Sequence, residues 1–177
     1  MRAESDRERF QRLDAMRKGA KTTTYSATYG VGKAKLARTA GISEKEAQEL
    51  LDAFWELNWA VKKVADGMYV KTLKDGSTWL KNPVSGFYYN LRSDRDKFST
   101  LNQGTGVYCF DTWAMFARKL GVQVCASFHD EVVIWHKDPK WVKKVLEEAM
   151  DRTNEKLNLN VKLGIDVQYG RNYSEVH

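Results

Sequence analysis

The chain has 177 residues, and its 29 Lys and Arg against 23 Asp and Glu give a formal net charge of +6. Hydrophobic residues make up 42% and charged residues 29%, a globular composition that excludes a disordered or collagen-like chain. No apolar run approaches the roughly 20 residues of a membrane-spanning helix, and the charged N-terminal sequence MRAESDRERF is not expected to act as a signal peptide. Two cysteines and three histidines are too few for a Cys/His zinc site. We therefore expect a reducing, cytoplasmic location and no membrane association, and the mild basicity permits a polyanionic partner.

The first 66 residues are predicted to be helical. Hydrophobic residues recur there at helical spacing, and glycines follow several of the expected helices. Ser5 with Glu8, and Ser43 with Glu46, fit capping boxes, in which the serine hydroxyl and the glutamate carboxylate satisfy backbone N–H groups at the helix start. The helices are expected at about 5–16, 17–29, 33–38 and 43–66.

Beyond residue 67 the hydrophobic pattern becomes mixed. Short strands with hairpin turns alternate with amphipathic helices. The expected strands are 68–73, 78–80, 87–90, 122–128, 131–136 and 161–167, and the expected helices are 102–120 and 139–157. Only His129-Asp130 separates two of these strands, which predicts a tight hairpin. The predicted fold class is therefore α+β, with a helical region at 1–66 followed by a region at 67–177 that contains an antiparallel sheet.

Four residues at intervals of four form the first candidate site, which we call the cation–tyrosine stripe. It consists of Arg17, Lys21, Tyr25 and Tyr29. Four residues turn a helix by about 400°, so these side chains follow one slowly winding line. Two cations followed by two aromatic rings suit a nucleotide, with phosphates near the cations and a sugar or base near the rings. The alternative is an amphipathic helix whose tyrosines pack on a neighbouring element.

The second candidate site is the tip of the predicted hairpin, where His129, Asp130 and Glu131 interrupt two apolar runs. Ionisable side chains between two buried strands are costly unless they bind something. Adjacent carboxylates suit Mg²⁺, which takes a few carboxylate oxygens together with substrate phosphates. A simple hydrophilic turn is the alternative.

Two glycine-containing motifs carry less information. Gly30-Val31-Gly32-Lys33 is not a phosphate-binding loop, because that loop requires GxxxxGK followed by Ser or Thr. Gln103-Gly104-Thr105-Gly106 by itself indicates only the entry of a helix. A phosphate-loop NTPase is therefore excluded as a function.

Taken together and in this order, the motifs resemble the C-terminal part of a family A (Pol I-like) DNA polymerase. The cation–tyrosine stripe with Gly30 resembles the family's motif B, the nucleotide-binding helix of the fingers. The His-Asp-Glu run at 129–131 resembles motif C, the palm hairpin, and 103–105 resembles the helix that meets the primer–template. The run at 169–177 resembles the family's C-terminus, where a final His is common. This resemblance implies a helical fingers subdomain at 1–66, and remaining fingers elements with part of an antiparallel-sheet palm at 67–177.

The resemblance implies a DNA-directed DNA polymerase, a nucleotidyltransferase of DNA replication that adds a dNTP to a primer 3′-hydroxyl by two-metal phosphoryl transfer. Arg17 and Lys21 would bind the triphosphate, and Lys21 would also assist catalysis. Tyr25 would stack near the sugar and base of the dNTP. Tyr29 would complete the dNTP site and, with Gly30, border the templating position.

The resemblance also implies metal and nucleic-acid ligands. Asp130 and Glu131 would hold catalytic Mg²⁺, and both would count as catalytic residues. His129 would lie near the primer end. Gln103 and Arg95 would contact the minor groove of the primer–template DNA.

One part of the family pattern is missing from this sequence. Motif A places a metal-binding Asp on a palm strand before motif B, and nothing in 1–16 resembles such a strand. Asp130 and Glu131 are consecutive, so on a strand they would point to opposite faces and could not complete a two-metal site. We therefore expect either a subunit of a split polymerase or a fragment of a polymerase. A phage-type source would suit a split gene, with a location in the host cytoplasm if phage-encoded. Activity is expected only with a second chain carrying motif A, the thumb and any exonuclease. The alternative is a catalytically incomplete DNA-binding accessory or relic.

Overall fold

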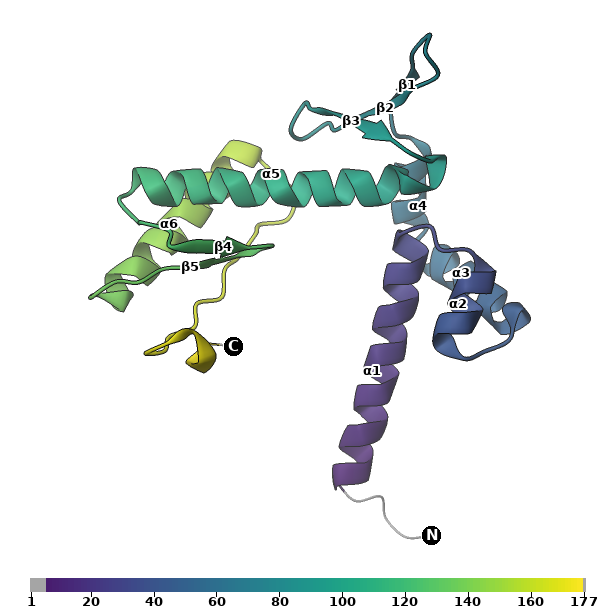
Figure 1. Cartoon of the computed structure of the whole chain (residues 1–177), viewed down its shortest axis with the longest axis horizontal. Coiled ribbons are helices and arrows are strands. Elements are labelled where there is room, and N and C mark those ends of the chain that lie inside the picture. Colours follow the sequence, from purple (N-terminus) through teal and green to yellow (C-terminus); the bar gives the residue numbers. More distant parts are fainter. Residues whose placement is uncertain (1–5, 177) are drawn as a thin grey trace. The chain divides into compact units, whose positions relative to one another are not determined.

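Helices dominate the first of two units into which the chain divides in a computed structural model, which describes residues 6–176 (Figure 1). The first unit comprises the described residues up to Asn82 together with Gly86–Asn102, and the second comprises Pro83–Ser85 and the residues from Gln103 onward. Helices and antiparallel strands occur in the same chain, so the predicted α+β class is confirmed. No helix within 6–176 is long and apolar enough to cross a membrane.

The first helix, α1 (Asp6–Thr28), is a single continuous element. The predicted boundary between two helices near residue 17 is wrong. An ion pair of 2.7 Å between the Lys18 ammonium and the Asp14 carboxylate crosses that point at helical spacing, and Gly19 within the helix costs only about 1 kcal/mol relative to alanine. The predicted cap at Ser5 lies outside the described residues.

The C-terminal end of α1 packs against the next two helices, α2 (Lys33–Ala40) and α3 (Glu44–Leu57). Their core consists of Ala27, Leu36, Ala37, Ala47 and Leu51. Burial of each of the two leucine side chains stabilises the folded state by about 1.5–3 kcal/mol. The end of α1 that carries the two tyrosines of the stripe is thereby fixed to a small helical core.

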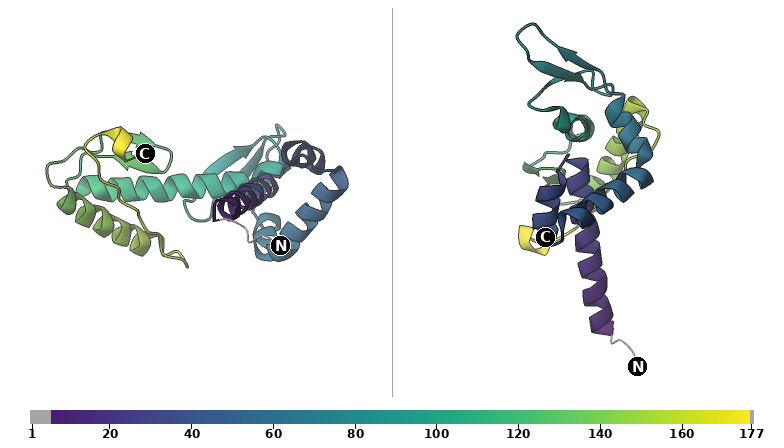
Figure 2. Two further views of the ribbon diagram at one scale, coloured as in Figure 1. Left: turned by 90° about the horizontal axis from the view of Figure 1, so that it is seen from below. Right: turned by 90° about the vertical axis from the view of Figure 1, so that its right-hand side faces the viewer.

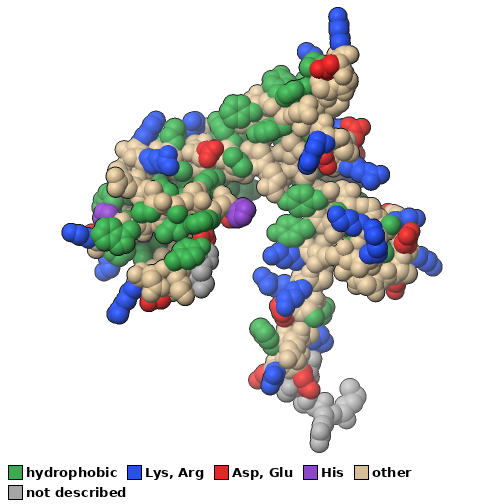
Figure 3. Space-filling model, in the orientation of Figure 1, with side chains coloured by type: hydrophobic (Ala, Val, Ile, Leu, Met, Phe, Trp, Pro, Cys, Tyr) green, Lys and Arg blue, Asp and Glu red, His purple; other side chains and the backbone are tan. Residues whose placement is uncertain are grey.

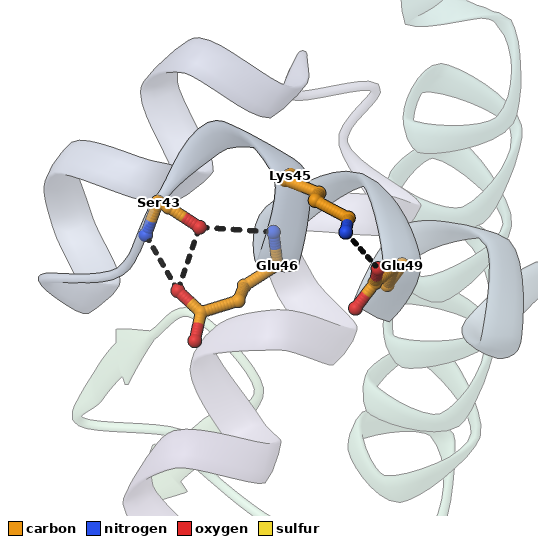
Figure 4. A network of polar contacts seen from close by, with 4 residues as sticks. All are labelled: Ser43, Lys45, Glu46 and Glu49. Atoms are coloured by element: carbon orange, nitrogen blue, oxygen red, sulfur yellow. Dashed lines mark hydrogen bonds and ion pairs between the residues drawn. The ribbon is translucent and has the colours of Figure 1, made fainter.

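Helix α3 begins with the predicted capping box, which is confirmed (Figure 4). The Glu46 carboxylate accepts hydrogen bonds from the backbone N–H of Ser43 at 2.9 Å and from its hydroxyl at 2.7 Å. The Ser43 hydroxyl oxygen in turn accepts from the Glu46 N–H at 3.2 Å. One turn further on, an ion pair of 4.0 Å joins Lys45 to Glu49.

Helix α3 and the short helix α4 (Trp59–Asp66) meet at Asn58, so the prediction of one helix over 43–66 is wrong. The Asn58 side-chain amide donates to the Phe54 carbonyl oxygen at 2.8 Å. An asparagine that bonds the backbone in this way competes with the helical ladder. Its backbone, at φ −105° and ψ 36°, leaves the helical conformation.

A three-stranded antiparallel sheet completes the first unit. Its strands are β1 (Val70–Thr72), β2 (Thr78–Lys81) and β3 (Tyr88–Leu91), in the order β1–β2–β3. Leu80 and Leu91 are buried on one of its faces. The short 3-10 helix η1 (Asp94–Asp96) follows and leads into the next helix, α5 (Lys97–Lys119).

The second unit is built on α5 (Lys97–Lys119), whose later part packs with the hairpin of β4 (Ala126–Phe128) and β5 (Glu131–Val133) and with α6 (Pro139–Leu157). Figures 1 and 2 show the hairpin and α6 beside this part of α5. The core consists of Trp113, Ala117, Val122, Val142, Val145, Leu146 and Ala149. The Trp113 indole N–H donates to the Leu146 carbonyl oxygen at 3.2 Å, which ties α5 to α6.

The predicted strand at 161–167 is wrong, because this segment forms no ladder in the described structure. The side-chain amide of Asn154 on α6 makes hydrogen bonds to both the carbonyl and the N–H of the Leu163 backbone. Its amide donates to the Leu163 carbonyl at 2.9 Å, and its side-chain oxygen accepts from the Leu163 N–H at 2.8 Å. The side chain thus takes the place of a neighbouring strand. The subdivision into fingers at 1–66 and the remainder at 67–177 stays a prediction.

Candidate functional site

The cation–tyrosine stripe runs along the exposed side of α1. The Lys21 ammonium lies 5.6 Å from the centroid of the Tyr25 ring, within cation–π range. The Tyr25 and Tyr29 rings are stacked, with centroids 6.2 Å apart and planes inclined by 29°. Tyr25 is 52% exposed and Tyr29 is 40% exposed, so the described residues do not bury them as core side chains. Arg17 is exposed one turn before Lys21.

The stripe ends at Gly30, which has a left-handed backbone conformation, and a distant part of the chain packs against this glycine. Gly30 has φ +66°, a conformation that favours glycine, and its N–H donates to the Ala27 carbonyl at 3.0 Å. A Cβ at Gly30 would stand 2.9 Å from the Arg95 carbonyl oxygen. The predicted site residues Gly30 and Arg95 therefore touch through their backbones.

A basic groove of about 400 Å³ lies at this contact. Its lining includes Tyr29 and Gly30 with three cationic side chains, those of Lys35, Arg38 and Arg95. Asp96 is the acidic residue of the lining, so cations outnumber carboxylates by three to one. A groove with this charge suits the phosphates of a nucleic-acid backbone.

Sequence reasoning missed two of these cations. Lys35 and Arg38 lie three residues apart on α2, the spacing at which side chains share one face of a helix. The signal in the sequence was the run of Lys33, Lys35 and Arg38 directly after the left-handed Gly30. The position of Arg95 beside them depends on tertiary packing, because Arg95 is 57 residues beyond Arg38 in the chain (95 − 38).

The second candidate site is the turn between β4 and β5, where the predicted hairpin is confirmed. Phe128 pairs with Glu131, so His129 and Asp130 form a two-residue turn. His129 adopts φ +49°, which a residue other than glycine rarely does and which a primed hairpin turn requires. Asp130 is exposed and lies in the turn rather than on a strand, while Glu131 is half-buried at the start of β5.

The C-terminal segment approaches this turn. The 3-10 helix η2 (Tyr173–Glu175) places the Tyr173 ring 6.1 Å from the Phe128 ring. The Glu175 carboxylate accepts from the Arg171 N–H at 2.8 Å and from the Asn172 side-chain amide at 3.0 Å, which fixes the segment's shape. The predicted terminal motif therefore lies partly beside the hairpin, and its His177 is outside the described residues.

The donor set at the turn fits part of a magnesium site. Carboxylate oxygens are the ligands that Mg²⁺ prefers, and Asp130 and Glu131 supply two carboxyl groups. Among residues 6–176, however, no group of three or more His, Cys, Asp or Glu side chains is placed to hold a metal ion. The remaining ligands would have to be water, substrate phosphate or carboxylates from elsewhere.

Gln103 is an exposed residue within α5, six residues after the helix begins at Lys97. The predicted start of this helix at residue 102 is therefore too late. The structure places the predicted residues in two groups. Those of the first unit are Arg17, Lys21, Tyr25, Tyr29, Gly30 and Arg95, and those of the second are Gln103, His129, Asp130 and Glu131.

Comparison with known proteins identifies the family. Residues 6–175 match the profile of DNA polymerase family A. DNA polymerase I of Caldicellulosiruptor bescii is 28% identical over 90% of this chain and 20% of its own length. DNA polymerase I of Bacillus caldotenax is 25% identical over 88% of this chain and 19% of its own length. The chain thus spans about a fifth of the length of these relatives.

A solved structure shares the fold. It is the POL domain of Pol1 from M. smegmatis, in complex with DNA primer-template and dNTP. The TM-score is 0.72 at 19% sequence identity, over 92% of this chain and 31% of that one. Together with the match over residues 6–175, these similarities show that the chain belongs to DNA polymerase family A.

Proposed function

We propose that this chain forms the fingers and part of the palm of a DNA-directed DNA polymerase, which adds dNTPs to a primer under the direction of a template. The observation that carries the proposal is the family A match over residues 6–175, which includes both candidate sites. In this reaction the primer 3′-hydroxyl oxygen bonds to the α-phosphorus of the dNTP, and the bond to the leaving pyrophosphate breaks.

The cation–tyrosine stripe is proposed to bind the dNTP. Arg17 and Lys21 are exposed cations one helical turn apart, a spacing of about 6 Å that suits neighbouring phosphates. They would hold the triphosphate and offset the negative charge that develops on it during transfer. Tyr25 would lie against the sugar and base, and Tyr29 with Gly30 would border the templating base. The stacking of the two rings supports this arrangement.

The hairpin turn is proposed to hold the catalytic metal. Asp130 and Glu131 would ligate Mg²⁺, and His129 would contact the primer end. Mg²⁺ bound there would act as a Lewis acid on the phosphate oxygens and favour the ionised primer hydroxyl. The exposure of Asp130 at the turn leaves its carboxylate accessible to metal and substrate.

DNA contacts are proposed along the basic groove and on α5. Arg95, with Lys35 and Arg38, would bind backbone phosphates, and Gln103 would reach the minor groove of the primer–template. Phosphate contacts of this kind position DNA without reading its sequence, as a general polymerase requires.

A complete two-metal site is proposed to need a carboxylate from outside the described residues, as in the motif A of the family. Two metal ions about 3.5–4 Å apart require bridging carboxylates from more than one element. A polypeptide segment that carries motif A and a thumb would supply it, either in the same polypeptide or in the second chain of a split polymerase.

Equilibrium binding of a fluorescent dATP analogue to the 177-residue chain tests the nucleotide site. Lys21→Ala should weaken binding about tenfold, because one charge-assisted phosphate contact contributes about 1.5 kcal/mol or more. Arg12→Ala is the matched control, since Arg12 is an exposed cation on the opposite side of α1, nine residues or about two and a half turns from Lys21. Equal weakening by the two variants, or no binding by the wild-type chain, would contradict the proposal.

A further inference from the structure

One face of the β1–β2–β3 sheet carries an ordered set of aromatic and basic side chains. In antiparallel strands, directly paired residues lie on the same face and successive residues alternate. Lys71 pairs with Trp79, which pairs with Asn90, and Lys81 pairs with Tyr88. We call this surface the aromatic face. It comprises Tyr69, Lys71, Trp79, Lys81, Tyr88 and Asn90, with Tyr69 placed opposite Lys81 by a backbone hydrogen bond of 3.2 Å.

Most side chains of the aromatic face are exposed and Trp79 is half-buried, whereas the opposite face contains two buried leucines. Leu80 is fully buried and Leu91 is 6% exposed on the covered side. On the aromatic face, Tyr69 is 60% exposed and Tyr88 is 51% exposed. Figure 3 shows hydrophobic side chains gathered over this sheet, with Lys or Arg side chains at the tip of its hairpin.

Local contacts orient two of the rings. The Trp79 indole N–H donates to the Ser77 hydroxyl at 2.9 Å, which satisfies its polar group and holds the ring on the sheet. The Lys81 ammonium lies 5.8 Å from the centroid of the Tyr88 ring. A cation therefore lies over the Tyr88 ring, within reach of the phosphate of a base that approaches this surface.

The charge of the sheet is complementary to a polyanion. Residues 68–91 contain three lysines and a single acidic residue, Asp75. Asp75 lies in the β1–β2 turn, where its carboxylate accepts from the Ser77 N–H at 2.9 Å and from the Ser77 hydroxyl at 2.6 Å. These hydrogen bonds hold the carboxylate in the turn, where the Ser77 hydroxyl links it to the Trp79 indole at the edge of the aromatic face. The three lysines still outnumber this one carboxylate.

We propose that the aromatic face binds single-stranded DNA, with bases stacked on Tyr69, Trp79 and Tyr88 and phosphates paired with Lys71 and Lys81. Aromatic rings beside lysines on an open sheet suit unpaired bases, because every base can stack and each is flanked by a phosphate. A duplex presents no free base faces and would meet only the lysines. The choice of DNA over RNA rests on the proposed function, and the binding itself requires neither dNTP addition nor a second chain.

Fluorescence anisotropy with a labelled oligothymidylate of about eight nucleotides, a length within the range that single-strand-binding modules cover, tests the proposal. Tyr88→Ala should weaken binding by about fivefold or more, since one stacked base contributes that much. Tyr88→Phe retains the ring and should bind within about twofold of wild type. Trp59→Ala is the control, because Trp59 is an aromatic residue on α4 that is 65% exposed. Circular dichroism would verify that each variant is folded.

The lysines are tested by the salt dependence of the same binding. The double variant Lys71→Gln/Lys81→Gln should flatten the slope of log K against log salt by about 1.4, because each phosphate contact to a single strand contributes about 0.7. Lys45→Gln, at an exposed lysine of α3, should leave the slope unchanged.

Two results would overturn the inference. The first is wild-type affinity in both Tyr88→Ala and the double lysine variant. The second is binding of a duplex of equal length as tightly as the single strand with no effect of Tyr88→Ala. Either result would leave the proposed function standing, because the dATP analogue tests the stripe on α1 separately.

Discussion

Gly30 and Arg95 approach each other so closely that no side chain fits between them. A Cβ atom at Gly30 would lie 2.9 Å from the Arg95 carbonyl oxygen and 3.1 Å from the Arg95 Cβ. Both residues line the basic groove, so this backbone contact joins the end of the cation–tyrosine stripe to the segment before α5.

Gly30→Ala should destabilise the folded chain by more than the strain of a side chain at a positive φ alone. At φ +66° a Cβ costs about 1–2 kcal/mol through local strain, and the collision with the Arg95 backbone adds to this. Gly41→Ala is a matched control, because Gly41 has φ +69° and a Cβ at that position would meet nothing within 4 Å. Urea unfolding of both variants measures the difference. Equal losses of stability would show that the segment carrying Arg95 moves aside without cost.

Asp130→Ala should remove nearly all polymerase activity of the assembled enzyme and leave DNA binding largely intact. Loss of a metal ligand removes stabilisation of the transition state, not contacts to the DNA backbone. Single-turnover primer extension and DNA-binding anisotropy measure the two effects. Asp151→Ala is the control, since Asp151 is an exposed carboxylate on α6. Retention of more than about a tenth of wild-type kcat, a barrier change below roughly 1.4 kcal/mol, would contradict the role of Asp130.

Tyr25→Phe should make the assembled enzyme discriminate against dideoxynucleotides. In the proposed dNTP site, the Tyr25 hydroxyl would supply a polar contact near the sugar that the 3′-hydroxyl of a dNTP otherwise provides. An unpaired polar group in a closed site costs about 1–3 kcal/mol, which corresponds to roughly 5- to 150-fold. The measurement is the ratio of kcat/KM for dNTP and ddNTP, with Tyr89→Phe as the control, because Tyr89 is a half-buried tyrosine on β3 outside both candidate sites. The same ratio in wild type and Tyr25→Phe would show that Tyr25 does not lie beside the sugar.

The capping box of α3 should make stability depend on pH in the acid range. Hydrogen bonds from the Ser43 hydroxyl and N–H lower the pKa of Glu46 from its ordinary value of 4.5. A lowered folded-state pKa means that the stabilisation is present above the unfolded value and is lost as pH falls through the folded one. The stability difference between wild type and Glu46→Gln should therefore persist at neutral pH and shrink below about pH 4.5.

Urea unfolding of wild type and Glu46→Gln across this pH range measures that difference. Glu44→Gln provides the comparison, because Glu44 lies in the same first turn of α3 but outside the capping box. A difference between wild type and Glu46→Gln that stays constant down to about pH 3 would refute the linkage.

Local signals explain what the sequence could predict. The Ser43–Glu46 capping box, the α+β class, the two-residue turn at His129-Asp130 and the stripe all arise from residues within a few positions of one another. Such features can be predicted because the interacting residues lie in one short stretch of the chain and do not depend on tertiary packing.

Competing tertiary contacts and side-chain hydrogen bonds explain what the sequence could not predict. Gly19 was compatible with either a break or a continuous helix, and Asn58 ends α3 through a bond to Phe54 that helical periodicity does not reveal. The run at 161–167 has a strand-like pattern, yet Asn154 occupies the backbone of Leu163. In the same way, the basic groove required Arg95 to fold back onto Gly30.

Primer extension by the 177-residue chain tests the central claim most directly. The chain would be assayed alone and after purification as a complex with a polypeptide that carries the motif A strand and thumb of a family A polymerase. We expect no extension by the chain alone, template-directed extension by the complex, and loss of that extension when the complex contains Asp130→Ala. Robust extension by the chain alone would contradict the need for an added carboxylate. Extension by the Asp130→Ala complex that equals wild type would contradict the proposed catalytic role. A stable wild-type complex that does not extend primers would contradict it as well.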